Sequence, residues 1–553
     1  EKVKFANCQL VVIVLTHSLQ SMNSLFALSI ALIVASHIDS TYCFVTTHLQ
    51  SAAFIDQKFK QQVSTVLSST SSSAATSIDL SALCSDLNNA LSQSSSIIKD
   101  AKIKVKPTGN SCRIGLYANT NLGKNEVAIS FPYTDGGSGC LNADEALDII
   151  PHLPAQYDGW TGDYGLLAML LLHEKANQCE REPNRKTEIV ELMRAWMAAL
   201  PTPEEMEKSH PLLWPEVSQD ELQGSSTKKI YRLLDDAEED AVWLEECLWE
   251  AHPDDFPEEI FNLQMWKWAL AVAYSRAVFL DGMLRIVPIV DIANHGDEFG
   301  TVEVQAGNFG MFGTTKGCQI RVGREYKKGE QIFVSYGPKS ASEYLLEYGF
   351  IPPSVIRNPL AELTFEIDKD DRFGDEKLDI LEFDTYGGAM DPIQSFDVGG
   401  ADGQPDPALV QFLRLCVLGG KDSFILESIF RKEVWDFMAQ PMSEDNERLV
   451  VEAVIGKVSD TIDDMIEDDD QGAEVDVTDM TPEGLCKVLR GIERKALHMT
   501  ADYMTREGEA LDLKEYYQER RLKDLGLDSE WQEDNPDVGW GQSRAKGGKD
   551  LDW

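Results

Sequence analysis

Basic residues are scarce in this sequence. Lys and Arg together number 50 against 93 Asp and Glu, which gives a formal net charge of −43 over 553 residues. A surface with this excess of negative charge repels nucleic-acid phosphates and anionic lipid headgroups. The composition therefore argues against nucleic acid or a membrane surface as a stable partner, whereas an acidic rim attracts a basic segment of a protein.

Paired cysteines are also missing. The ten cysteines are scattered along the chain, and none forms a Cys-x-x-Cys pair with another. Their spacing fits none of the usual zinc frameworks, and we expect no metal site. Free thiols in a reducing compartment are the simplest expectation.

Long hydrophobic runs are absent too. The apolar stretches Leu10–Leu15 and Leu25–Ala35 both fall short of the roughly 18 residues that span a bilayer. If translation starts at Met22, the second stretch forms the core of a signal peptide, and Cys43-Phe44 marks a cleavage point. Ten of the fourteen residues from 64 to 77 are Ser or Thr, as in a transit peptide. The sequence thus predicts a two-part address for the plastid stroma, with a secretory signal followed by a disordered linker as the alternative.

Two segments in the second half of the chain end in polar residues. Val287–His295 is an apolar run that stops at Asp, Asn and His, which predicts a buried strand with hydrogen-bonding groups at its end. Gln331–Tyr336 alternates as a strand does, and Gly329 and Gly337 punctuate its two ends. We expect the Asn-His end and the Tyr-Gly end to converge on one site.

These segments resemble motifs of the SET-domain methyltransferases. The likeness is to the subgroup typified by the Rubisco large-subunit lysine methyltransferase, and four motifs carry it in order and spacing. They are Val-Pro-Ile-Val-Asp-Ile-Ala-Asn-His (287–295), Gly-Glu-Gln-Ile-Phe-Val-Ser-Tyr-Gly (329–337), Ser-x-x-Glu (340–343) and Tyr-Gly-Phe (348–350).

The resemblance implies an α+β fold. A SET domain of short β-sheets would span 97–355, with a helical insert at about 143–280. A mostly helical substrate-binding domain would follow over 356–531. Residues 1–96 would be the targeting region and a linker, and residues 532–553 a disordered tail.

The resemblance also implies roles for individual residues. Tyr336 would supply the hydroxyl at the reacting centre. The cofactor would be S-adenosyl-L-methionine (SAM), bound by Cys112, Arg113, Ile114, Arg276, Asn294 and His295. The substrate channel would be lined by Asp291, Leu280 and Tyr348.

Two of the cofactor positions leave alternatives open. Arg276 lies on an otherwise apolar segment, so its charge needs an anion. A salt bridge with Asp281 or Asp291 would satisfy it, and the resemblance implies the SAM carboxylate instead. In the loop at 112–114, family members commonly carry Glu-Gly ahead of Gly-Leu, whereas this chain has Cys-Arg-Ile. The family contact there is made largely through the backbone.

The implied reaction is methyl transfer to a lysine amine, which must be neutral. With an ordinary pKa of about 10.4, roughly one lysine in a few thousand is neutral near pH 7, and a desolvated channel beside a cation lowers that pKa. We therefore expect a SAM-dependent protein-lysine N-methyltransferase acting on a non-histone protein such as Rubisco or another stromal enzyme. The alternatives are a histidine methyltransferase of the same fold and an inactive SET-derived binding module, which the changed 112–114 loop and Ala341 keep open.

Overall fold

The computed structural model describes residues 79–520 with internal gaps. The gaps fall at 97, 99, 110–112, 134–138, 155–158, 181–184, 225, 227, 298–299, 310–314, 383–390, 427–432, 467–479 and 518–519. The expected targeting segment before residue 79, the loop residue Cys112 and the expected tail at 532–553 lie outside the described residues. The chain divides into two compact units at Ile78/Asp79, and only the second is described below. Among its described residues, no helix combines the length and hydrophobicity that a membrane crossing requires.

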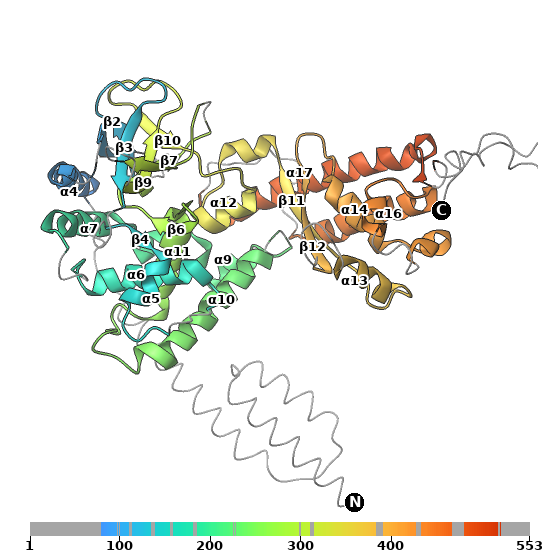
Figure 1. Ribbon diagram of the computed structural model, residues 1–553, viewed down its shortest axis with the longest axis horizontal. Coiled ribbons are helices and arrows are strands. Elements are labelled where there is room, and N and C mark those ends of the chain that lie inside the picture. Colours follow the sequence, from blue (N-terminus) through green and yellow to red (C-terminus); the bar gives the residue numbers. More distant parts are fainter. Residues whose placement is uncertain are drawn as a thin grey trace, which may run out of the picture. The chain divides into compact units, whose positions relative to one another are not determined.

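A four-stranded sheet brings the two motif segments together. Its order is β1 (Ile103–Pro107), β2 (Ile114–Ala118), β10 (Gln331–Val334) and β7 (Asn294–His295) (Figure 1). β10 pairs antiparallel with β2 and parallel with β7, so that Val334 lies opposite His295. The expected convergence of the Asn-His and Tyr-Gly ends is therefore confirmed.

Two smaller sheets complete the β-structure of this part. One has the order β3 (Val127–Pro132), β9 (Thr315–Arg321), β8 (Gln305–Phe309). The other has the order β4 (Leu141–Asn142), β6 (Met283–Ile286), β5 (Val278–Leu280). Short sheets of this kind are what the SET-like reading predicts.

A helical block lies in sequence between β4 and β5, as expected for the insert. It contains α5 (Ala146–Ile149), α6 (Gly162–Ala176), α7 (Thr187–Ala199), α8 (Pro203–Met206), α9 (Glu216–Asp220), α10 (Lys228–Leu244) and α11 (Leu263–Arg276). Every residue of α6 from Gly165 to Glu174 is buried, because α11 packs against it. A helix that is apolar nearly all round is stable only in such a buried position.

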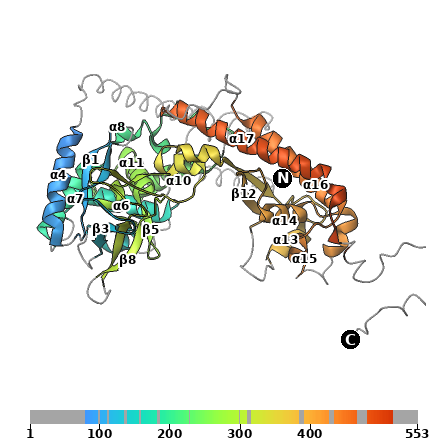
Figure 2. The same cartoon turned by 90° about the horizontal axis from the view of Figure 1, so that it is seen from above.

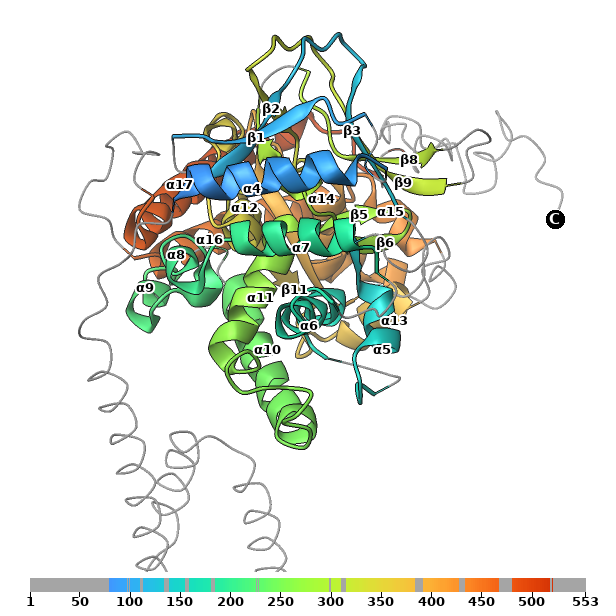
Figure 3. The same ribbon diagram turned by 90° about the vertical axis from the view of Figure 1, so that its left-hand side faces the viewer.

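The fold begins earlier than the sequence indicated. Helix α4 (Leu80–Gln93) starts at Asp79, whose side chain accepts hydrogen bonds from the first-turn amides. It buries Cys84, Leu87 and Leu91 and lies beside α7 (Figure 3). The boundary near residue 97 was therefore placed too late, because the Ser-rich composition masked an amphipathic repeat.

Helix α11 ends at Arg276, and β5 begins at Val278. One further expectation near the site was wrong. The apolar run from Val287 is not a strand, since Val290–Ile292 is a short 3₁₀ helix. Pro288 lacks an amide donor, and Ile289 has a φ of 72°, a costly conformation for a β-branched residue.

The C-terminal part is mostly helical with one two-stranded sheet. β11 (Leu360–Glu366) pairs antiparallel with β12 (Ile393–Gly399). The helices are α12 (Ala341–Tyr348), α13 (Gly374–Glu382), α14 (Pro407–Cys416), α15 (Val434–Met438), α16 (Glu444–Asp464) and α17 (Pro482–Glu509). The mostly helical character expected of this part is confirmed, whereas β12 was not predicted.

Helix α17 joins two hydrophobic cores. Its first turns, including Leu485 and Leu489, belong to the core that takes in the SET-like sheets. Its later turns, including Leu497 and Met504, belong to the core built on β11, β12 and α16, beside which it runs (Figure 2). The domain boundary near residue 355 stays a prediction, which this division of the cores supports.

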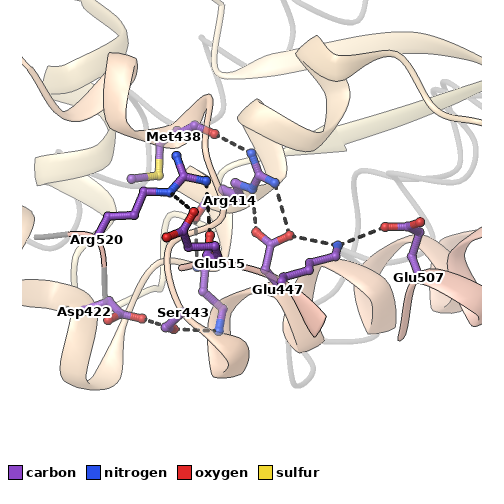
Figure 4. A network of polar contacts seen from close by, with 10 residues as sticks. Arg414, Asp422, Met438, Ser443, Glu447, Glu507, Glu515 and Arg520 are labelled. Carbon is purple, nitrogen blue, oxygen red and sulfur yellow. Dashed lines mark hydrogen bonds and ion pairs between the residues drawn. The ribbon is translucent and has the colours of Figure 1, made fainter. Parts of the chain in front are cut away.

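A buried ion pair links two helices of the second core. Arg414 of α14 contacts both carboxylate oxygens of Glu447 on α16, at 2.5 and 3.1 Å, and donates to the carbonyl of Met438 at 2.9 Å (Figure 4). Lys514 lies 3.5 Å from Glu447 and 3.0 Å from Glu507. Because both ends of the Arg414–Glu447 pair are buried, losing one would leave an uncompensated charge.

Candidate active site

Tyr336 lies just beyond β10 and is fixed by β7 and its flank. Its backbone amide donates to Nδ1 of His295 at 3.3 Å, and its hydroxyl donates to the carbonyl of Ala293 at 3.0 Å. Its ring stacks on that of Tyr348, with centroids 4.5 Å apart. A hydroxyl that donates in this way keeps its oxygen lone pairs available as acceptors.

His295 is a structural anchor of this corner. Because Nδ1 accepts from a backbone amide, the ring proton is assigned to Nε2, which lies 2.7 Å from a carboxylate oxygen of Asp297. The ring also packs against Tyr344 and Phe350, with centroids 5.2 and 6.1 Å away. These contacts fix the end of β7 next to Tyr336.

Asn294 ties the 112–114 loop to the same corner. Its side-chain amide donates to the carbonyl of Ile114 at 2.9 Å. A Cβ on Gly115 would lie 2.9 Å from that amide and 2.6 Å from Nε2 of Gln331, so a larger residue would displace both. The start of β2, at Ile114 and Gly115, therefore packs closely against Asn294.

Arg276 is paired with Asp291, not with Asp281. Its Nη1 lies 2.8 Å from the buried Asp291 carboxylate, which also accepts from the indole of Trp196 at 3.0 Å. Burial raises the pKa of Asp291, although Arg276 and Trp196 act to lower it. Nε of Arg276 is buried and has no hydrogen-bond partner among the described residues. The guanidinium thus has an internal partner and a further donor to offer.

A cavity of about 280 Å³ unites four of the expected residues. They are Arg276, Asp291, Tyr336 and Tyr348. Leu280, expected in the channel, is instead buried in the core. Leu280 is the last residue of β5, and the two residues before it, Val278 and Phe279, line the cavity in its place.

Other lining residues escaped the sequence argument. Glu303 and Val304 lie on a loop that the amide of Ser335 holds by donating to the Val302 carbonyl at 3.0 Å. Glu347, one residue before Tyr348, also lines the cavity and pairs with Lys339 at 2.8 Å. Of these residues, only Glu347 had a sequence signal that could have placed it in the cavity, because it directly precedes the Tyr-Gly-Phe motif.

The cavity carries phenols that stay protonated at neutral pH. Burial raises the pKa of Tyr164 to about 12. Burial, and next the charge of Glu347, raise the pKa of Tyr348 well above its usual range. Neutral aromatic walls suit an alkyl-amine chain, because they bind its methylenes and tolerate its cationic form.

The residues present fit a cofactor with an amino-acid end. A carboxylate is the natural partner for the unsatisfied N–H of Arg276. Asn294 and His295 shape the adjoining backbone, and Arg113 lies near enough to Arg276 for the two charges to interact. An unsatisfied guanidinium donor beside a second arginine is compatible with the carboxylate end of SAM.

Comparison with known proteins identifies relatives of this chain. Residues 368–497 match the family described as Rubisco LSMT substrate-binding. A chloroplastic fructose-bisphosphate aldolase-lysine N-methyltransferase of Arabidopsis thaliana is 30% identical over 425 residues, covering 75% of this chain and 82% of that protein. The chloroplastic Rubisco large-subunit N-methyltransferase of Pisum sativum is 32% identical over 325 residues, covering 57% of this chain and 65% of that protein.

Solved structures extend the likeness to the fold. The SET domain of LSMT bound to lysine and AdoHcy has a TM-score of 0.67 and 26% identity, covering 82% of this chain and 98% of that one. Rubisco LSMT bound to AdoMet has a TM-score of 0.64 and 25% identity, covering 80% and 97%. Fold and site together define a SAM-dependent SET-domain protein methyltransferase. The chain belongs to the Rubisco large-subunit methyltransferase-like family of protein-lysine N-methyltransferases.

Proposed function

We propose that this enzyme methylates a lysine of a plastid protein, with the Rubisco large subunit and fructose-bisphosphate aldolase as the first candidates. The relatives named for these two substrates are both chloroplastic proteins. The observation that carries the proposal is the single cavity in which the Tyr336 hydroxyl, the Tyr348 ring and the Arg276–Asp291 pair meet. An extended amine side chain fits such a channel.

In this proposal, SAM is held by Arg276, Asn294, His295 and the 112–114 loop. Arg276 uses the donor that Asp291 leaves unsatisfied, while Asn294 and His295 act by fixing backbone groups. Bound SAM supplies an activated methyl group, so the chain has to position the amine and keep water out.

Tyr336 and Tyr348 position the lysine amine. The Tyr336 hydroxyl donates to Ala293, so its oxygen accepts an N–H from the amine and turns the nitrogen lone pair toward the methyl donor. Tyr348 stacks on Tyr336 and walls the channel. Glu303, exposed at the same cavity, attracts the ammonium form before the amine is desolvated.

Mass spectrometry of stromal extract incubated with the enzyme and deuterated-methyl SAM tests this function. We expect labelled methyl groups on lysine of one or a few abundant stromal proteins. Label on histidine would favour the alternative amine acceptor, and absence of any enzyme-dependent label would contradict the proposal.

A further inference from the structure

Arg113 departs from the family pattern, and its side chain lies close to the proposed cofactor site. Its Nη1 donates to the carbonyl of Ala199 at 2.8 Å, and its Nε lies 3.1 Å from Glu205. Ala199 is the last residue of α7, and Trp196, three residues earlier, donates to Asp291, the partner of Arg276. Arg113 and Arg276 therefore flank the same end of α7.

The positive charges of Arg113 and Arg276 repel one another. Burial, which contributes most, and also the charge of Arg276 lower the pKa of Arg113, with Glu205 opposing them. Each arginine has its own carboxylate, Glu205 or Asp291. Two like charges that repel one another are stabilised by an anion that contacts both.

Each guanidinium also has a buried donor without a partner. Nη2 of Arg113 and Nε of Arg276 make no hydrogen bond among the described residues. Leaving such a donor buried and unsatisfied costs about 1–3 kcal/mol. A single carboxylate has two oxygens and could accept from both.

We propose that the Arg113 side chain is a second guanidinium for the cofactor carboxylate, alongside Arg276. The inference rests on the proposed cofactor site and adds a side-chain contact where the family relies on backbone. Arg113 acts on the amino-acid end of the cofactor and not on its nucleoside. Glu205 holds the guanidinium in place, since its carboxylate is itself fixed by the backbone amide of Thr202 at 2.9 Å.

The test compares two ligands that differ at the amino-acid end. S-adenosylhomocysteine carries the carboxylate, whereas 5′-methylthioadenosine lacks the whole amino-acid group. In Arg113→Met, calorimetry should show about tenfold weaker binding of S-adenosylhomocysteine, the loss of one charge-assisted hydrogen bond. Binding of 5′-methylthioadenosine should stay unchanged.

Two control variants separate this role from a structural one. Arg113→Lys keeps the charge but not the forked geometry. Its affinity for S-adenosylhomocysteine should therefore fall severalfold, a smaller loss than in Arg113→Met. Arg285→Met removes another buried guanidinium, which lies 4.5 Å above the Tyr133 ring, and should leave the affinity for both ligands intact. If Arg113→Met does not fold, Arg113→Lys is tested in its place. It should lose severalfold affinity for S-adenosylhomocysteine and none for 5′-methylthioadenosine.

Three results would overturn the inference. Unchanged S-adenosylhomocysteine affinity in a folded variant would remove Arg113 from the site. Equal losses for both ligands, together with a lower melting temperature, would assign it a structural role. Failure of the unaltered protein to bind S-adenosylhomocysteine would refute the proposed function itself, because the inference depends on that site.

Discussion

Glu493 is a buried carboxylate whose only described partner is Ser226. Both of its oxygens accept from the Ser226 amide, at 3.1 and 3.2 Å, where α17 passes the loop ahead of α10. Burial raises the pKa of Glu493 to about 7, with Glu362 contributing in the same direction. Ionisation of Glu493 is therefore disfavoured in the folded protein, whereas in the unfolded chain the carboxyl ionises at its ordinary pKa.

The sign of the effect follows from this raised pKa. Below the ordinary pKa of 4.5 the group is protonated in both states, and its ionisation costs no stability. As the pH rises to about 7 the unfolded chain ionises first, so the folded state loses stability. At about 1.4 kcal/mol per pKa unit, the loss between pH 5 and pH 8 amounts to about 2 kcal/mol.

Glu493→Gln should remove this pH dependence. Urea unfolding at pH 5 and pH 8 should show that the variant gains about 2 kcal/mol relative to the unaltered protein on going to the higher pH. Glu452→Gln, at an exposed position of α16, is the matched control and should track the unaltered protein at both pH values. Parallel stability profiles for Glu493→Gln and the unaltered protein would refute the reasoning.

Three further predictions concern the cofactor, the C-terminal core and the address. Arg276→Ala should weaken SAM binding by about 2–4 kcal/mol in calorimetry, through loss of a charge-assisted pair, and unchanged affinity in a folded variant would contradict its assignment. Arg414→Met should cost about 3 kcal/mol in urea unfolding because it leaves the buried Glu447 with Lys514, 3.5 Å away, as its remaining cation. The exposed pair lost in Arg448→Met should cost less than about 1 kcal/mol, and equal costs would contradict the argument from burial. A reporter protein fused to the C-terminal end of residues 22–77 should enter the plastid, and the same fusion with Phe44→Ala should remain outside it. Secretion of the unaltered fusion would contradict the plastid address.

Local sequence patterns predicted those elements whose burial follows a regular repeat along the chain. Strand β10 was recognisable because glycines bound an alternating run. The segment from Val287 failed, since Pro288 and the positive φ of Ile289 make a turn that only the surrounding fold can stabilise. β12 failed for a related reason: its burial pattern depends on β11, which is distant in sequence.

The site shows the same division between local and distant information. Tyr336 and Asn294 stand in motifs, and the pairing of β7 with β10 could be inferred from them. For Arg276 the sequence left Asp281, Asp291 and the SAM carboxylate open as partners, and the structure shows a pair with Asp291 that leaves Nε without a hydrogen bond among the described residues. Glu303 carries no local signal, because tertiary contacts alone bring its loop to the cavity.

Methyl transfer by Tyr336→Phe tests the central claim most directly. The substitution removes one oxygen and keeps the ring that stacks on Tyr348, so SAM binding should stay unchanged, and loss of the hydrogen bond to the Ala293 carbonyl should lower the melting temperature only slightly. If the hydroxyl orients the amine as the transition state forms, as we propose, kcat for lysine methylation should fall about ten- to thousandfold with little change in KM. Normal turnover in the Phe variant would contradict the proposed role of Tyr336 at this site.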